Sequence, residues 1–196
     1  MHISEGVLES AILLPSAAIT GAFLVANLIR VKPAQIPKIA CMSAIFFIAS
    51  FIHVPLGPAS IHLILSGIVG TILGFDAILA IFVGLLFQGL FFGYGGVAVL
   101  GVNSLIIAFP AVFSRQILKF TQEKVKWRNL GFFLCGFLPV LLSSVLLSLI
   151  LVLNGDEFVK IANLIFVYNL ILAIIEGIIA LFCLNFIFRV KREILC

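Results

Sequence analysis

The residues best suited to chemistry are the three histidines of the chain, His2, His53 and His62. Met1 and His2 together offer three nitrogens: the α-amine, the His2 main-chain amide once it is deprotonated, and the His2 imidazole. Such a nitrogen set, closing fused chelate rings around one ion, suits square-planar Ni(II), Cu(II) or low-spin Co(II). A frayed polar terminus is the alternative interpretation of this dipeptide.

A planar site needs a fourth ligand, which another histidine can supply. His62 follows the turn that Gly57 and Pro58 predict, at the expected start of a helix, and is a better candidate than His53. Metal binding requires neutral imidazoles, so we expect the affinity to fall below about pH 6. Because a large second residue should block removal of the initiator methionine, we expect the free amine to remain on the first residue.

The composition indicates which elements carry these residues. Hydrophobic residues make up 63% of the chain and charged residues 10%, whereas soluble domains are about half apolar and about a quarter charged. The apolar stretches are long enough for membrane-spanning helices, which need about 20 residues. We therefore expect an all-α polytopic membrane bundle, with residues 1–196 as a single integral membrane domain and residues 1–6 as a metal-binding segment inserted into it.

Proline, glycine and charged residues divide the chain into seven predicted transmembrane helices. Turn-forming residues also predict irregular backbone at residues 56–60 and 93–96, because proline and glycine favour turns over helix interiors. The predicted helices cover residues 7–29, 38–53, 60–74, 76–92, 97–122, 131–153 and 162–189.

The basic residues predict the orientation in the membrane. With seven spans, every one of the twelve Lys and Arg residues except Lys160 falls on one side. The positive-inside rule puts that side in the cytoplasm, with the N-terminus outside, the C-terminus cytoplasmic and the histidines near the outer side. The basic residues flank helices, where membrane lipid is their expected partner, and form no aromatic-interleaved patch of the kind that binds nucleic acid.

Further polar residues fall near the expected metal site. Gln88 and Asn103 lie at the predicted outer ends of two helices, where they could orient the ligand histidine or cap the backbone. Glu5 is expected to hold the N-terminal segment by hydrogen bonding, because a hard carboxylate oxygen is less suited to a planar nitrogen site. His53 and Ser60, which flank the turn before the ligand histidine, are also expected in the surroundings of the ion.

Glu176 is an ionisable residue predicted to lie within a span. An ionisable group there is costly and is a functional candidate by default. The alternative is a neutral carboxyl bonded to a neighbouring helix, and the sequence leaves both interpretations open.

These motifs resemble a known family. Residues 1–6, MHISEG, are similar to the N-terminal signature of the CbiM/NikM family of energy-coupling-factor transporters. The chain differs from many family members at Tyr94, where an acidic residue or His is frequent, and at Asn169, where His is frequent. The resemblance continues in residues 53–63, 88–96 and 101–103 and in Glu176-Gly177.

The resemblance implies a substrate-binding (S) component of an ATP-driven uptake transporter in the cell inner membrane. The Met1 amine, the His2 amide and imidazole, and His62 would hold Co(II) or Ni(II), which is the transported substrate, and no prosthetic group is implied. The implied partners are a transmembrane coupling protein of the CbiQ/NikQ type, a cytoplasmic ATPase pair of the CbiO/NikO type and a small accessory membrane subunit of the CbiN/NikN type.

The chain itself is not expected to be an enzyme. It has no glycine-rich loop ending in Gly-Lys-Ser/Thr, so ATP hydrolysis is assigned to the partners. It also lacks the His-Glu-x-x-His and Gly-x-Ser-x-Gly motifs of hydrolases. The alternative function is an S component or secondary transporter for another small substrate, such as a vitamin, with no role for the N-terminal amine.

Overall fold

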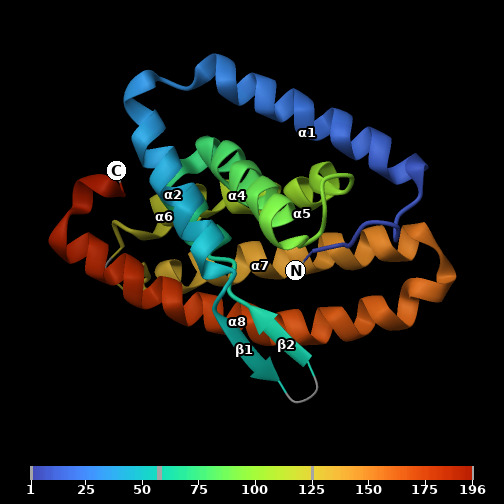
Figure 1. The fold of residues 1–196 in the computed structure, drawn as a ribbon. Coiled ribbons are helices and arrows are strands. Elements are labelled where there is room, and N and C mark those ends of the chain that lie inside the picture. Colours follow the sequence, from blue (N-terminus) through green and yellow to red (C-terminus); the bar gives the residue numbers. More distant parts are fainter. Residues whose placement is uncertain (1, 57–58, 125, 196) are drawn as a thin grey trace.

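The computed structural model describes residues 2–56, 59–124 and 126–195, with the backbone alone for residues 53–56 and 59–61. Helices make up most of this part of the chain, and one short β-hairpin projects from the side of the bundle (Figure 1). The helices are α1 (Ser10–Arg30), α2 (Ile36–Ala49), α3 (Ser66–Leu73), α4 (Ala77–Phe92), α5 (Leu100–Val112), α6 (Ser114–Thr121), α7 (Arg128–Asn154) and α8 (Val159–Val190), and the strands are β1 (His53–Leu56) and β2 (Ala59–His62).

The helices give a multi-pass membrane protein. Within the described residues, five segments are long and apolar enough to cross a membrane, and a shorter apolar helix covers residues 33–49. Two of the five segments each join two helices, α3 with α4 and α5 with α6. The five segments are Ser10–Arg30, Ser66–Phe92, Leu100–Thr121, Arg128–Asn154 and Asp156–Val190.

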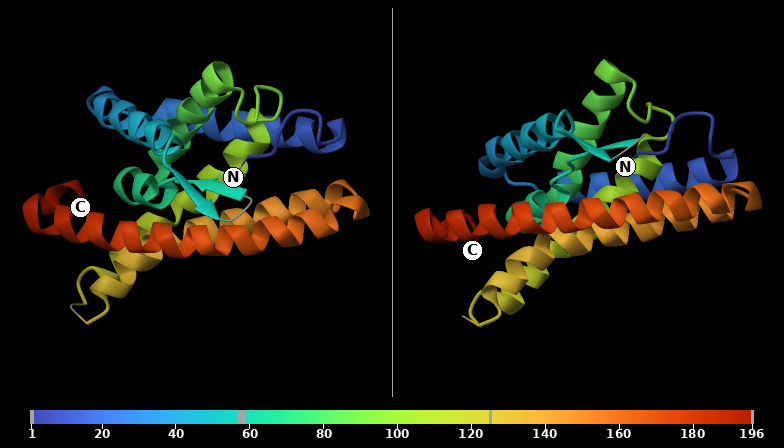
Figure 2. Two further views of the ribbon diagram at one scale, coloured as in Figure 1. Left: turned by 60° about the horizontal axis from the view of Figure 1, so that its bottom comes forward. Right: turned by 90° about the horizontal axis from the view of Figure 1, so that it is seen from below.

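Helices α7 and α8 form a long antiparallel pair that lies along one side of the molecule in both views of Figure 2. Their close approach depends on Gly136, where a Cβ atom would meet the main-chain oxygen of Glu176. Helix α8 has 32 residues, which corresponds to about 48 Å at the α-helical rise. The turn between α7 and α8 lies beside residues 7–9, and the C-terminal residues lie at the far end of α8.

Helix α3 is short and packed inside the bundle. All eight of its residues are buried. A Cβ atom at Gly67 would meet the carbonyl oxygen of Cys135 in α7, and one at Gly70 would meet that of Ala111 in α5. The glycines therefore bring α3 into backbone contact with two neighbouring helices.

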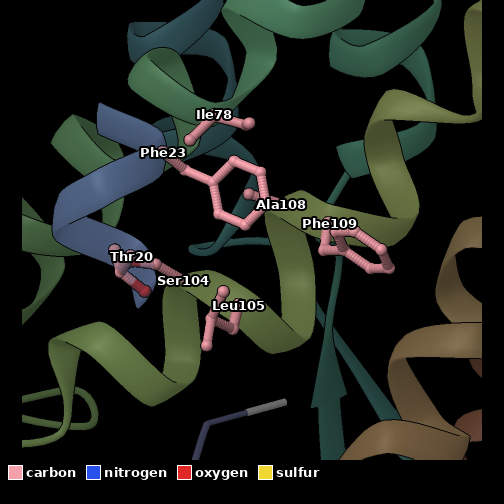
Figure 3. Close-up of a pocket in the computed structure, with 7 residues that line it drawn as sticks. All are labelled: Thr20, Phe23, Ile78, Ser104, Leu105, Ala108 and Phe109. Carbon is pink, nitrogen blue, oxygen red and sulfur yellow. The ribbon is translucent and has the colours of Figure 1, made fainter. Parts of the chain in front are cut away.

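Helix α1 packs across α5 and α4, and much of its surface remains exposed. The Thr20 hydroxyl donates a hydrogen bond of 2.7 Å to the carbonyl oxygen of Gly101. Figure 3 shows a small hollow along this contact, with side chains from α1, α4 and α5 pointing into it. The hollow is a packing gap and contains none of the candidate metal ligands. Its lining residues are Thr20, Phe23, Ile78, Ser104, Leu105, Ala108 and Phe109.

The histidine-bearing segment differs from the prediction. We expected a helix ending at residue 53 and another beginning at residue 60, but α2 ends at Ala49 and α3 begins at Ser66. The residues between them pair as an antiparallel hairpin in which His53 faces His62 in register. Leu65, with a φ of 56°, then turns the chain into α3. Proline and the β-branched residues of this segment suit extended backbone better than helix. Gly57 and Pro58 lie outside the described residues.

Candidate metal-binding site

His2 and His62 lie side by side although 60 positions separate them in the sequence. Their ring centroids are 5.1 Å apart and the ring planes differ by 12°. His2 belongs to the irregular segment before α1, and His62 is the last residue of β2. The two imidazoles are therefore stacked against each other. Met1 lies outside the described residues.

The ring of His2 is buried without a hydrogen-bond partner. Neither Nδ1 nor Nε2 has a partner among the described residues. An unpaired buried polar group is costly. Burial lowers the pKa of His2 well below its ordinary value, and the neighbouring His62 lowers it further. The ring is therefore held neutral, which is the form that binds a metal ion.

The tautomer of His62 follows from its own main chain. Its Nδ1 lies 3.0 Å from the carbonyl oxygen of Leu63. Because a carbonyl only accepts hydrogen bonds, Nδ1 is the protonated nitrogen in this contact. The neutral ring then presents Nε2 as its lone-pair nitrogen. Donation from the other ring nitrogen to a carbonyl is the usual arrangement of a metal-binding histidine.

Asn103 holds the N-terminal segment in place. Its Oδ1 accepts a hydrogen bond of 2.9 Å from the Ile3 main-chain N–H, and its Nδ2 donates one of 3.0 Å to the Ile3 carbonyl oxygen. Asn103 is only 3% exposed. Of the two roles expected for this residue, orienting the ligand histidine or capping the backbone, its amide makes the bond to the main chain, at the residue that follows His2.

Glu5 continues the same attachment. Its main-chain N–H donates to the carbonyl oxygen of Gly95 at 2.9 Å, and its Oε1 accepts from the Ala98 N–H at 2.8 Å. The carboxylate thus bonds to the loop between α4 and α5. It does not reach the histidine pair through any hydrogen bond that the structure records among the described residues.

The loop after α4 must contain glycine at this contact. Gly95 and Gly96 have φ values of 77° and 101°, which favour glycine. A Cβ atom at Gly95 would lie 2.7 Å from Nδ2 of Asn103, and one at Gly96 would meet the Glu5 side chain. The irregular segment that the sequence predicts at residues 93–96 is confirmed, and its shape lets the N-terminal segment lie against it.

Asn154, which belongs to none of the motifs in the sequence, provides a second clamp. Its Nδ2 donates to the Val7 carbonyl oxygen at 2.9 Å, and its Oδ1 accepts from the Glu9 N–H at 3.0 Å. It is the last residue of α7, and Gly155 follows it with a φ of 158°. An asparagine before a glycine is typical of a helix end, so nothing in the sequence pointed to this long-range role.

A cavity of about 210 Å³ adjoins His2. The N-terminal segment forms one wall of the cavity and the facing ends of α7 and α8 form the other, so the wall is mostly apolar. The lining residues are His2, Ile3, Ser4, Val7, Leu147, Leu151, Phe158, Ile161 and Ile165.

The remaining predicted residues are distributed differently. Gln88 is 1% exposed, and its Oε1 has no hydrogen-bond partner among the described residues. Glu176 is 1% exposed, and its carboxylate accepts hydrogen bonds from the main-chain N–H groups of Ile64 and Leu65. The side chains of His53 and Ser60 lie outside the described residues.

The described side chains alone do not complete a metal site. In the part of the chain that the structure describes, no three His, Cys, Asp or Glu side chains come together in a way that could hold a metal ion. A site built on His2 and His62 must therefore take its other ligands from main-chain nitrogen or from outside this set.

Comparison with known proteins identifies the family. The family model described as the cobalt uptake substrate-specific transmembrane region, CbiM, matches residues 2–194. The chain belongs to the CbiM family. A Haemophilus influenzae protein whose name assigns it to metal transport is 35% identical over 199 residues, with 100% of this chain and 97% of that protein covered. Membership makes this chain a membrane component of metal uptake.

Two further matches are informative. A Methanocorpusculum labreanum protein named as a fused cobalt transport protein, CbiMQ, is 26% identical over 216 residues and is matched over 36% of its length by 99% of this chain. A crystal structure described as a truncated transition metal transporter has a TM-score of 0.76 at 22% identity, covering 96% of this chain and 99% of the other. The latter likeness concerns the fold.

Proposed function

We propose that this CbiM-family chain captures Co(II) or Ni(II) for an ATP-driven transporter of the energy-coupling-factor type. One observation carries the proposal: the His2 ring is buried beside His62, and neither of its nitrogens has a hydrogen-bond partner among the described residues. An ion bound there would satisfy a polar group that is otherwise costly to bury. The donor set of imidazole and main-chain nitrogen also suits these ions.

The proposed ligands are the Met1 amine, the His2 amide nitrogen, the His2 imidazole and the His62 imidazole. The absence of a third nearby side-chain ligand among the described residues is compatible with this set, because two of its four nitrogens are not side-chain atoms. The clamps at Asn103 and Asn154 support it further, since they hold the segment that carries the first two residues against the bundle.

We further propose that this chain is one integral domain of the cell inner membrane with seven membrane crossings. Its N-terminus would lie outside and its C-terminus in the cytoplasm. Basic residues gather at the end of the bundle remote from the N-terminal segment, which supports this orientation. Lys38 Nζ bonds the Ile194 carbonyl oxygen at 3.4 Å, and the Arg128 and Arg192 guanidinium groups each lie 4.8 Å from the Phe188 ring centroid.

The energy source lies in other proteins under this proposal. The fused CbiMQ relative favours a CbiQ-type coupling partner for this chain. An ATPase pair of the CbiO/NikO type and a small CbiN/NikN-type subunit complete the proposed transporter. The chain binds and releases the ion and catalyses no reaction.

The experiment that tests the proposal compares the purified full-length chain with a version that carries one extra residue before Met1. The extension displaces the amine from the chelate and leaves every side chain present. We expect the unmodified chain to bind Ni(II) or Co(II) in equilibrium titration, with a planar-site absorption spectrum, and the extended chain to lose both. Equal binding by the two proteins would refute the amine–His2 site and favour a transporter of another small substrate. Competition between the two ions in the unmodified chain identifies the preferred one.

A further inference from the structure

A buried carboxylate meets the peptide group next to His62. Glu176 lies in the middle of α8 and is 1% exposed. Its Oε1 accepts a hydrogen bond of 2.6 Å from the Ile64 N–H, and both of its oxygens lie 3.0 Å from the Leu65 nitrogen. Every recorded bond of this side chain is accepted, which is the pattern of an ionised carboxylate.

The backbone at this point is shaped for an anion. Leu65 has a φ of 56° and a ψ of 19°, in the left-handed region that a leucine rarely adopts. Two successive N–H groups around such a residue form a concave anion-binding nest. Helix α3 begins at the next residue, and no side chain of its own caps it. Glu176 therefore holds the chain between His62 and α3 in a costly conformation.

The peptide group between Leu63 and Ile64 contacts both Glu176 and the proposed ligand His62. The Leu63 carbonyl and the Ile64 N–H belong to one planar trans peptide, so they point in opposite directions. The N–H donates to Glu176, and the carbonyl oxygen accepts from Nδ1 of His62 at 3.0 Å. The order of hydrogen bonds is carboxylate, peptide, imidazole.

We propose that Glu176 is a positioning residue for His62, acting through this single peptide group on the orientation and electron donation of the imidazole. The inference rests on the proposed metal site. A carboxylate polarises the peptide, and a polarised carbonyl draws on the Nδ1 proton, which makes Nε2 a better donor to a metal. The usual partner of a metal-binding histidine is a carboxylate or a carbonyl; here both act in series.

The position of Glu176 is held by the packing of α8 against α7. Gly136 of α7 packs against its main-chain oxygen, and Gly177 leaves room for the Phe133 ring. The carboxylate consequently belongs to the rigid α7–α8 pair, while His62 belongs to the hairpin. The hydrogen bonds of Glu176 join these two parts close to the ion.

The test uses the full-length chain with Glu176→Gln, which keeps the size of the side chain and removes its charge. Asn27→Leu is the matched control. Asn27 is also fully buried and also bonds main chain, since its Nδ2 donates to the Phe75 carbonyl oxygen, but it lies near the C-terminal end of α1. Both variants lose buried polar contacts, so thermal unfolding shows how far each is destabilised.

Two readouts separate positioning from stability. The first is the ¹⁵N and ¹H resonance of His62 Nδ1 in metal-free protein, which we expect to move in Glu176→Gln and to stay unchanged in Asn27→Leu. The second is the affinity for Ni(II) and Co(II), which we expect to fall about 10- to 100-fold in Glu176→Gln alone. A folded Glu176→Gln protein with an unchanged Nδ1 resonance and unchanged affinity would overturn the inference.

The first readout needs no metal, so it remains decisive if the unmodified chain binds neither ion. In that case the proposed function fails, while a shifted Nδ1 resonance still establishes the link from Glu176 to His62. An unshifted resonance would remove the link as well.

Discussion

The attachment of the N-terminal segment gives the sharpest prediction, because two hydrogen bonds to one residue hold it. In Asn103→Leu the side chain keeps about its size and loses both bonds to Ile3. A typical intramolecular hydrogen bond contributes about 1 kcal/mol net, so the inserted segment should lose about 2 kcal/mol relative to a detached one. That corresponds to a roughly 30-fold larger detached population.

Hydrogen exchange at the Glu5 amide measures this population. Its N–H is bonded to the Gly95 carbonyl oxygen, a contact that the Asn103→Leu substitution leaves in place. Faster exchange at Glu5 would therefore report detachment of the whole segment, and not merely the loss of one bond. With the protein in lipid nanodiscs, we expect the exchange rate to rise about 30-fold. The affinity for Ni(II) or Co(II) should fall by no more than this factor, since only the inserted segment binds.

Asn27→Leu serves again as the control, because it makes the same chemical change at a buried asparagine remote from the segment. Exchange at Glu5 should stay at the rate of the unmodified chain in this variant. An unchanged Glu5 rate in Asn103→Leu, in a protein that remains folded, would refute the idea that the amide clamp holds the segment inside the bundle.

Three further predictions follow from the packing and charge of the site. Burial lowers the pKa of His2 below its value in the detached segment, so the detached segment takes up a proton first as the pH falls below about 6.5. The inserted state loses stability in that range, and we expect the affinity for the metal ion to fall with it. Metal titrations between about pH 8 and pH 5 check this, and a pH-independent affinity would contradict it. Gly136→Ala should reduce the free energy of unfolding by about 1–3 kcal/mol in denaturant titrations, because the new methyl group would meet the main-chain oxygen of Glu176. An unchanged midpoint of the denaturant titration would show that α8 can shift to make room. Gly96→Ala, which combines a φ of 101° with contact to the Glu5 side chain, should speed exchange at the Glu5 amide, and no change would argue that the loop adapts.

The cavity beside His2 depends on the position of the N-terminal segment. Its walls come from the N-terminal segment on one side and from the ends of α7 and α8 on the other. Detachment of the segment would open this space, since the segment itself is one wall. The two asparagine clamps therefore hold both His2 and one wall of the cavity in place.

The sequence predicted the lipid environment of this protein and a set of candidate metal ligands. Apolar stretches of about 20 residues fit only a lipid environment, and that property is local to each stretch. Met1, His2 and His62 were likewise selected from residue types and motifs. Local turn chemistry predicted the irregular glycine segment after α4, since glycine conformations depend on few neighbours.

Tertiary structure decided how those residues are held. The bonds from Asn103 to Ile3, Asn154 to Val7 and Glu176 to Ile64 join positions 100, 147 and 112 residues apart. No periodicity in the sequence records which amide or carboxylate will face which peptide.

The hairpin is a part of the fold that the sequence alone did not predict. Its residues are apolar enough to be taken for the beginning of a helix, and the pairing of His53 with His62 competes with helix only once the strands meet. The tertiary contacts then decide where α3 begins, because Glu176 stabilises the left-handed Leu65 that turns the chain from β2 into the helix. Hydrophobicity decides that a segment is buried, whereas the secondary structure it adopts depends on contacts with distant parts of the chain.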